Sequence, residues 1–187
     1  MPRRNKSILF LGIAGIAGLF VASFMLSRAS APQEIIGTGT FTLPPSTSLY
    51  IPPELGDVYR NSQFGFSFSV PEGFAVRETS LSENLTITVE NTTGDGIQII
   101  ISPFDPEARE ISEAMVRADI PDMTLSDVQI IEIGTEHRGV AFLSDNEAFG
   151  GASREVWFPF RGNLYQISTY ARLDSLLQTI FSTWEFN

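Results

Sequence analysis

Asp145, Asn146 and Glu147 stand next to one another just before two glycines, and all three side chains carry oxygen atoms. Calcium is held by about six to eight oxygen ligands in proteins, and a loop dense in such side chains can supply several of them. The spacing differs from an EF-hand, which needs alternating ligands, a central glycine and a distal glutamate. The sequence therefore offers these three residues as a candidate calcium site, with an ordinary solvated hairpin loop as the alternative.

His137 is the single histidine of the chain, and its flanking sequence, residues 134–139, is typical of a tight turn between two strands. One histidine excludes a metal site built from several histidines, and no Gly-x-Ser-x-Gly motif positions a nucleophilic serine. The 22 acidic residues leave paired-carboxylate hydrolysis open. We therefore expect a protein that is not an enzyme and needs no cofactor, with a calcium-responsive or hydrolytic domain as the alternative.

Two features are candidates for contact with a partner. Phe149 is the aromatic member of the polar loop, so it either folds back on the core or is presented to another protein. Residues 64–70 alternate strictly, which places three phenylalanines and a valine on one side of a strand and only glycine and serine on the other. Phe149 and the Gly/Ser side of this strand are the surface features that the sequence points to.

Residues 7–27 form an uncharged run that follows a basic N-terminus, residues 1–6. A helix of this length covers roughly 30 Å, which matches the hydrocarbon thickness of a bilayer. Basic residues remain on the cytoplasmic side, so we expect a single-pass membrane anchor with the N-terminus inside and the rest of the chain outside the cell. The alternative is a cleaved secretory signal, because residues 29–31 have the small-x-small form that signal peptidase prefers.

Small residues recur every four positions in this segment, at Ala14, Gly18 and Ala22. Such spacing places them on one helix face, where a second helix can approach closely. The pattern predicts packing of membrane helices and a homo-oligomer. The alternative is that glycine and alanine are simply frequent in membrane helices.

Charge divides the chain at the end of the predicted anchor. Residues 1–28 contain four basic and no acidic residues, whereas residues 29–187 contain 8 basic and 22 acidic ones, which gives this part a net charge near −14. A surface of that charge repels nucleic acid and anionic lipid headgroups, so we expect no nucleic-acid partner. The chain has no cysteine, so disulfides and thiolate chemistry are excluded and the core alone holds the exported part together.

The exported part divides into a proline-rich linker, residues 28–56, and one globular domain, residues 57–187. Proline stiffens an extended chain, so we expect the linker to space the domain from the membrane or to lie along its surface. Alternating or continuously apolar runs predict strands in the domain. These strands cover residues 64–70, 85–89, 97–101, 128–133, 140–143, 154–160 and 164–170.

Two helices are expected among these strands. Asp105-Pro106 is typical of a helix start, and the following stripe of apolar residues (Ile111, Ala114, Met115 and Ala118) predicts a helix that ends near Ile120. A second helix begins at Asp174, and Trp184 and Phe186 follow it as buried anchors. This order of elements favours an α+β fold in which helices pack on an antiparallel sheet. Pro159 predicts an edge position or a bulge in its strand.

Tyr59-Arg60-Asn61 followed by Phe64-Gly65-Phe66-Ser67-Phe68 and Pro71 resembles the opening strand of PsbP-like domains. The segments 154–158, 162–170 and 176–186 are similar to uncharacterised single-pass membrane proteins of candidate-phyla bacteria that carry such a domain. The resemblance spans residues 57–187 and implies a PsbP-like α/β sandwich. Its motifs are core aromatics and turns, so it transfers no ligand or catalytic residue to this chain.

Together these features predict a binding or scaffold module of the cell envelope. The lipid bilayer is its first partner, through residues 7–27, and an envelope protein of unknown identity is the second. Self-association through the membrane helix is a further alternative.

Overall fold

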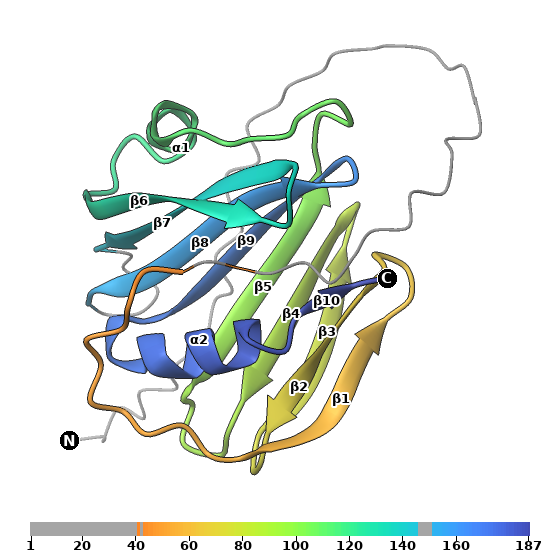
Figure 1. Ribbon diagram of the computed structural model, residues 1–187, viewed down its shortest axis with the longest axis vertical. Coiled ribbons are helices and arrows are strands. Elements are labelled where there is room, and N and C mark those ends of the chain that lie inside the picture. Colours follow the sequence, from red (N-terminus) through yellow and green to blue (C-terminus); the bar gives the residue numbers. More distant parts are fainter. Residues whose placement is uncertain (1–40, 42, 146–150) are drawn as a thin grey trace, which may run out of the picture. The chain divides into compact units, whose positions relative to one another are not determined.

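The computed structural model describes residue 41 and residues 43–145 and 151–187. Figure 1 shows the elements of this part of the chain. In chain order they are β1 (Leu55–Asn61), β2 (Phe66–Pro71), β3 (Ala75–Leu81), β4 (Asn84–Glu90), β5 (Gly96–Pro103), α1 (Glu113–Asp119), β6 (Leu125–Ile133), β7 (His137–Ser144), β8 (Ser153–Phe160), β9 (Asn163–Tyr170), a 3-10 turn (Ala171–Leu173), α2 (Asp174–Phe181) and β10 (Glu185–Phe186).

Two antiparallel sheets organise these elements. The larger has seven strands in the order β3-β4-β5-β9-β8-β7-β6, and the smaller has three in the order β1-β2-β10. Helix α2 lies across one face of the larger sheet, and α1 lies near the β6–β7 side of the sheet (Figure 1). The prediction of mostly antiparallel sheet with helices packed on it is confirmed for the described residues.

The core lies between the larger sheet, α2 and the smaller sheet. Phe66 and Phe68 of β2 are fully buried, as the alternation predicts, and the Phe66 ring stacks on Trp184 with centroids 4.6 Å apart. Trp184 and Phe186 are buried at the end of the chain, which confirms them as anchors. The Gly/Ser side of this strand is not a free surface, because Ser67 is only 2% exposed and Ser69 is half-buried.

The strands predicted from alternating or continuously apolar runs all occur, with ends that differ by at most three residues. β3 was not predicted from the sequence. Its burial is low along its whole length, with only Val76 half-buried, so it has no buried face to create an alternating apolar pattern. Its place in the sheet depends on its ladder with β4.

The first helix starts later than Asp105-Pro106 predicts. Its N-cap is Ser112, whose hydroxyl accepts the Met115 N–H at 3.3 Å, while the Asp105 carboxylate accepts the Glu107 N–H in a separate turn. The predicted stripe is right only for Ile111, which is buried just before the helix: within α1 the buried residue is Val116, and Met115 is 42% exposed. The reason is that a helix of seven residues at the end of a sheet buries only one narrow side.

Residue 41 and residues 43–54, which we call the strap, pack along α2 although the sequence assigns them to the linker. The Phe41 ring lies 4.6 Å from Phe181, and Phe41 forms an antiparallel bridge with Ile133 of β6. Gln178 of α2 donates to the Pro44 carbonyl at 2.6 Å, and Ser175 donates to the Tyr50 carbonyl at 2.6 Å. β1 begins at Leu55, two residues before the predicted domain start at 57.

We expect Phe41→Ala to destabilise the domain, because the half-buried ring fills space between α2 and the aromatic core. The expected loss is about 2 kcal/mol, below the range for a fully buried phenylalanine. Urea unfolding of the full chain measures it. Leu49→Ala is the control, since this strap residue is 96% exposed and its loss should leave stability unchanged. Equal stability of both variants would show that the strap does not support the core.

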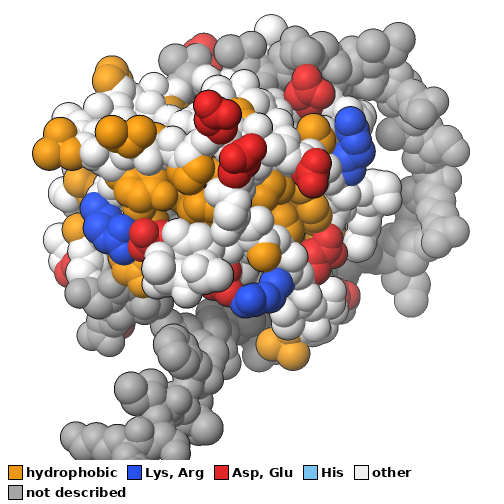
Figure 2. Space-filling model, turned by 90° about the horizontal axis from the view of Figure 1, so that it is seen from below, with side chains coloured by type: hydrophobic (Ala, Val, Ile, Leu, Met, Phe, Trp, Pro, Cys, Tyr) orange, Lys and Arg blue, Asp and Glu red, His pale blue; other side chains and the backbone are white. Residues whose placement is uncertain are grey.

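The surface around the strap combines apolar and acidic side chains. Leu49 and Ile51 are 96% and 89% exposed. Figure 2 shows a face on which hydrophobic side chains form a band, with both acidic and basic side chains around it.

The predicted anchor, residues 7–27, lies outside the described residues, as do Ala14, Gly18 and Ala22. No helix within the described residues is both long and apolar enough to cross a bilayer.

Candidate functional site

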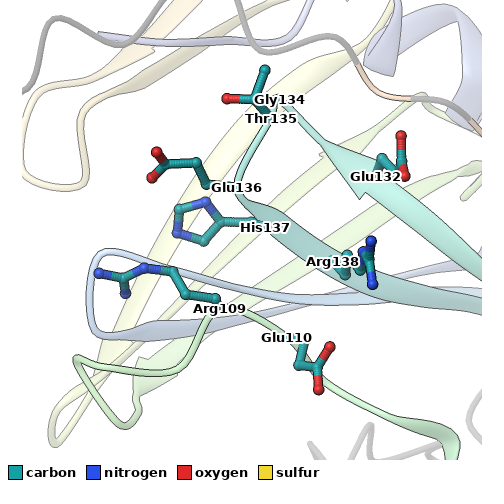
Figure 3. Close-up of a pocket in the computed structure, with 8 residues that line it drawn as sticks. All are labelled: Arg109, Glu110, Glu132, Gly134, Thr135, Glu136, His137 and Arg138. Atoms are coloured by element: carbon teal, nitrogen blue, oxygen red, sulfur yellow. The ribbon is translucent and has the colours of Figure 1, made fainter.

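A hollow of about 510 Å³ lies where β6 turns into β7 (Figure 3). It is polar and open to solvent, and its charged side chains are exposed. The residues that line it are Arg109, Glu110, Glu132, Gly134, Thr135, Glu136, His137 and Arg138. They come from two segments of the chain, the loop before α1 and the β6–β7 hairpin.

Pro159 explains why the sheet opens at this point. The ladder between β7 and β8 ends at the pair Val140–Trp157, and Pro159 is the residue that would face Arg138 if the register continued. Proline has no N–H to donate to such a ladder. The loop takes its place: the Arg138 N–H donates to the Arg109 carbonyl at 2.8 Å, and the Ile111 N–H donates to the Arg138 carbonyl at 3.1 Å.

Gly139 lets β7 approach β8 next to this break. A Cβ atom at position 139 would lie 2.4 Å from the Trp157 carbonyl oxygen and 2.7 Å from the Phe158 Cβ. No side chain larger than hydrogen fits there without moving the backbone. Gly139 and Pro159 therefore set the path of β7 at the base of the hollow.

The charged side chains of the hollow form two groups. Figure 3 shows Arg138 between Glu132 and Glu110, which agrees with its register opposite Glu132 and its parallel bridge with Glu110. Arg109 lies on the side of Glu136 and His137 in Figure 3. Two hydrogen bonds from its Nη1 hold it in place, to the carbonyls of residues 106 and 108 at 3.1 and 3.3 Å.

The charged side chains that line the hollow lack the ion pairs that most other arginines of the described residues form. Neither Arg109 nor Arg138 forms an ion pair with a described residue, and the three glutamates that line the hollow form none either. Four arginines elsewhere in the described residues do: Arg77, Arg117, Arg154 and Arg172. The charges of the hollow are therefore available to a ligand without breaking an ion pair between described residues, as are those of Arg60 and Arg161 elsewhere in the domain.

His137 is half-buried at the first position of β7, so the turn is shorter than the predicted residues 134–139. Its ring lies 5.1 Å from the ring of Phe160. The sequence pointed to His137 but not to the two arginines or the glutamates around it. The charged residues between Glu132 and Arg138 could have indicated a polar site from the sequence. Arg109 and Glu110 lie far from them in the sequence and are brought beside them only by the backbone bridge to Arg138.

A second polar cluster lies buried on the larger sheet. The Glu155 carboxylate of β8 is 2% exposed and accepts hydrogen bonds from Ser153 at 2.8 Å and from Ser168 at 2.5 Å. Ser144 of β7 extends the cluster through a 2.6 Å contact with Ser153. These hydroxyls compensate the burial of a charge, which is otherwise costly, so the cluster has a structural role.

Asp145 is the one member of the candidate calcium loop within the described residues, because Asn146, Glu147 and Phe149 lie outside them. Its carboxylate accepts the Thr124 N–H at 2.8 Å. Hydrogen bonding from the side chain and the backbone of Thr124 lowers the pKa of the Asp145 carboxyl below its ordinary value. The described residues contain no group of three or more histidines, aspartates or glutamates that could hold a metal ion.

We expect Asp145→Ala to lower the melting temperature slightly at pH 7. A carboxyl with a lowered pKa stabilises the fold above its ordinary pKa, and this contribution disappears as the pH falls through the lowered value. The difference from the natural chain should therefore vanish in acid. Melting curves between pH 7 and pH 2 measure it, with Asp122→Ala as an exposed control. A difference that persists at the lowest pH would contradict this role of the carboxylate.

No protein-family model and no curated protein matches the chain. Among solved structures, the chain is similar to the solution structure of cyanobacterial PsbP (CyanoP) from Synechocystis sp. PCC 6803. The sequence identity is 13% and the TM-score is 0.49, over 78% of this chain and 99% of that chain. This likeness concerns the path of the chain alone, and no residue role follows from it.

Proposed function

We propose that the chain is a membrane-anchored extracytoplasmic binding module, and that the hollow at the start of β7 contacts a partner protein of the cell envelope. The anchor is supported by the sequence, in which basic residues precede the uncharged run 7–27. The observation that carries the binding role is the hollow itself, where five charged side chains form no ion pair with any described residue.

The chemistry of the hollow suits a charged segment of another protein. Arg109 and Arg138 can bind carboxylates, and Glu110, Glu132 and Glu136 can bind basic side chains. Complementary charges set orientation and specificity at protein interfaces. A catalytic role is less well supported, because stabilisation of a transition state depends on a site from which water is excluded, and these side chains are exposed.

Site-specific photo-crosslinking tests this proposal in the full chain and its native membranes. A photoreactive amino acid replaces Thr135, an exposed residue of the hollow, and in the control it replaces Thr92, an exposed residue between β4 and β5. We expect one dominant envelope protein at position 135, a weaker adduct when Arg138→Glu is added, and none at position 92. Equal adducts at both positions, or only links between copies of this chain at position 135, would overturn the proposal.

Two further measurements separate the alternatives. Protease added to spheroplasts should digest residues 29–187, because we propose that this part lies outside the membrane. Protection of residues 29–187 would overturn the proposed topology. The melting temperature should be the same with calcium and with a chelator. A rise with calcium would favour the ion-responsive domain instead.

A further inference from the structure

The two outer strands of the seven-stranded sheet, β3 and β6, differ in how their free edges are treated. An outer strand presents unpaired N–H and C=O groups, which can pair with any extended segment that reaches them. Natural sheets block such edges with bulges, prolines, lysines or covering segments.

The edge of β6 is blocked in two ways. Its register with β7 shifts between Ser126 and Gln129, and Asp127 within this bulge has a φ of 49°. At the other end of the strand, Phe41 of the strap forms a bridge with Ile133. A partner strand therefore finds no regular ladder along β6.

The edge of β3 has none of these features. Its register with β4 runs from Ala75–Glu90 to Leu81–Asn84 without a shift, and residues 75–81 contain no proline, lysine or glycine. No other described strand pairs with it. Every residue from Arg77 to Leu81 is exposed, and Leu81 is 74% exposed. This edge is regular, accessible and seven residues long, which suits the addition of a strand.

Charge identifies the kind of strand that fits. Arg77 already forms an ion pair with Glu90, so it is compensated within the domain. Glu78, at the centre of the strand, accepts a hydrogen bond from the Tyr59 hydroxyl but forms no ion pair with a described residue. Because residues 29–187 carry a net charge near −14, a basic segment is attracted to this edge and an acidic one is repelled.

A second copy of the chain is a poorer occupant than a basic strand. Two copies of this acidic domain, each with a net charge near −14, repel each other. Two-fold antiparallel pairing centred on Glu78 or on Arg77 also places identical charges opposite each other, whereas pairing centred on Thr79 places Glu78 opposite Ser80 and opposes no like charges. Like charges directly opposite each other destabilise a strand pair. We therefore propose that the outer edge of β3 binds an extended, net-basic segment of a partner protein by adding it to the seven-stranded sheet.

A synthetic peptide probes this edge. The probe has the sequence Lys-Val-Thr-Val-Lys-Val-Thr, and its control carries N-methyl groups on alternate residues, which removes ladder donors but keeps the charge. Binding of fluorescent peptides to the full chain in detergent is measured by anisotropy. We expect the methylated peptide to bind at least tenfold more weakly, and hydrogen exchange to show protection of residues 75–81 with the unmethylated peptide alone.

Thr79→Pro should weaken binding of the unmethylated peptide about tenfold. Ser126→Pro is the matched control, because it changes the edge that is already irregular, and it should leave the affinity unchanged. The melting temperature of each variant establishes that it is folded. If folded Thr79→Pro protein binds as tightly as the natural chain, or if both peptides bind equally, the attraction is purely electrostatic and the proposal fails.

Self-association is the remaining outcome. If residues 75–81 are protected in the absence of peptide and Thr79→Pro converts a dimer into a monomer, then the edge binds a second copy, and the proposal of a basic partner strand is overturned. Neither result depends on the hollow, which lies on the β6–β7 side of the sheet, so the photo-crosslinking at Thr135 is judged separately.

Discussion

Alanine in place of Gly139 is expected to destabilise the domain by about 3 kcal/mol, at the upper end of the range for overpacked positions. The added Cβ would lie 2.4 Å from the Trp157 carbonyl oxygen, which is backbone and cannot rotate away. Either β7 moves away from β8 or the ladder between them breaks. Urea unfolding measures the loss, and amide exchange should show it first in β7 and β8.

Gly151→Ala is the matched control. A Cβ at position 151 meets no atom of a described residue within 4 Å, and the backbone there is not in the left-handed region. Its stability should stay within about 0.5 kcal/mol of the natural chain, as for most surface substitutions. If the two variants are equally stable, β7 and β8 are not held as closely as the structure indicates, and the geometry at the base of the hollow changes with them.

Asp174→Asn is expected to cost about 3 to 5 kcal/mol, the range observed when one partner of a buried ion pair is removed. Asp174 begins α2, and its Oδ1 lies 3.2 Å from Arg154 Nε of β8. The two side chains are only 8% and 9% exposed. Without the carboxylate, the Arg154 charge stays buried, and neither its Nε nor its Nη1 has a hydrogen-bond partner among the described residues. Thermal and urea unfolding of the variant measure this cost.

Two comparisons isolate the buried pair. Asp127 is the outer partner of Arg154: its side chain is 47% exposed and lies 3.5 Å from Arg154 Nη2. Asp127→Asn should therefore cost less than about 1 kcal/mol. The double variant Arg154→Met, Asp174→Leu removes both buried charges and should recover most of the stability, since well-packed apolar residues often replace such pairs. A double variant as unstable as Asp174→Asn would show that the charges are needed for more than their mutual compensation.

Gly139→Ala and Asp174→Asn test different contacts of the seven-stranded sheet. Gly139 and Pro159 govern how far β7 follows β8, and thereby where the hollow forms. Arg154 and Asp174 connect the beginning of β8 to the beginning of α2. Loss of stability without loss of crosslinking at Thr135 would separate the fold from the binding role.

Strands with a buried face were predictable from the sequence. In β2 and β4, apolar side chains alternate with polar ones, and β5 was predicted from its continuously apolar run, although its burial alternates in the structure. Pro159 was also informative, since a residue without an N–H marks the end of a ladder. β3 was not predictable in this way, and the start of α1 was misplaced because Asp105-Pro106 forms a turn with the same local chemistry as a helix cap.

The candidate site was predictable only in part. His137 and its turn were evident, but Arg109 lies far from them in the sequence and reaches them through its backbone pairing with Arg138. The acidic loop gave a calcium prediction that stays a prediction for Asn146 and Glu147, while Asp145 accepts a hydrogen bond from Thr124. The charge of a side chain is visible in the sequence, but its ion-pair partner is not.

The sequence by itself determines most of the local structure of this chain. Most strands and α2 can be placed from alternating phenylalanines and isoleucines, turn-forming glycines and the composition of the closing helix. The order β3-β4-β5-β9-β8-β7-β6, the packing of Phe41 against α2, the buried pair Arg154–Asp174 and the open edge of β3 come from the three-dimensional arrangement. The physical reason is that periodicity and turn chemistry act between neighbouring residues. Strand order, burial of charges and the position of a hollow depend on contacts between residues far apart in the chain, which packing of the whole domain selects.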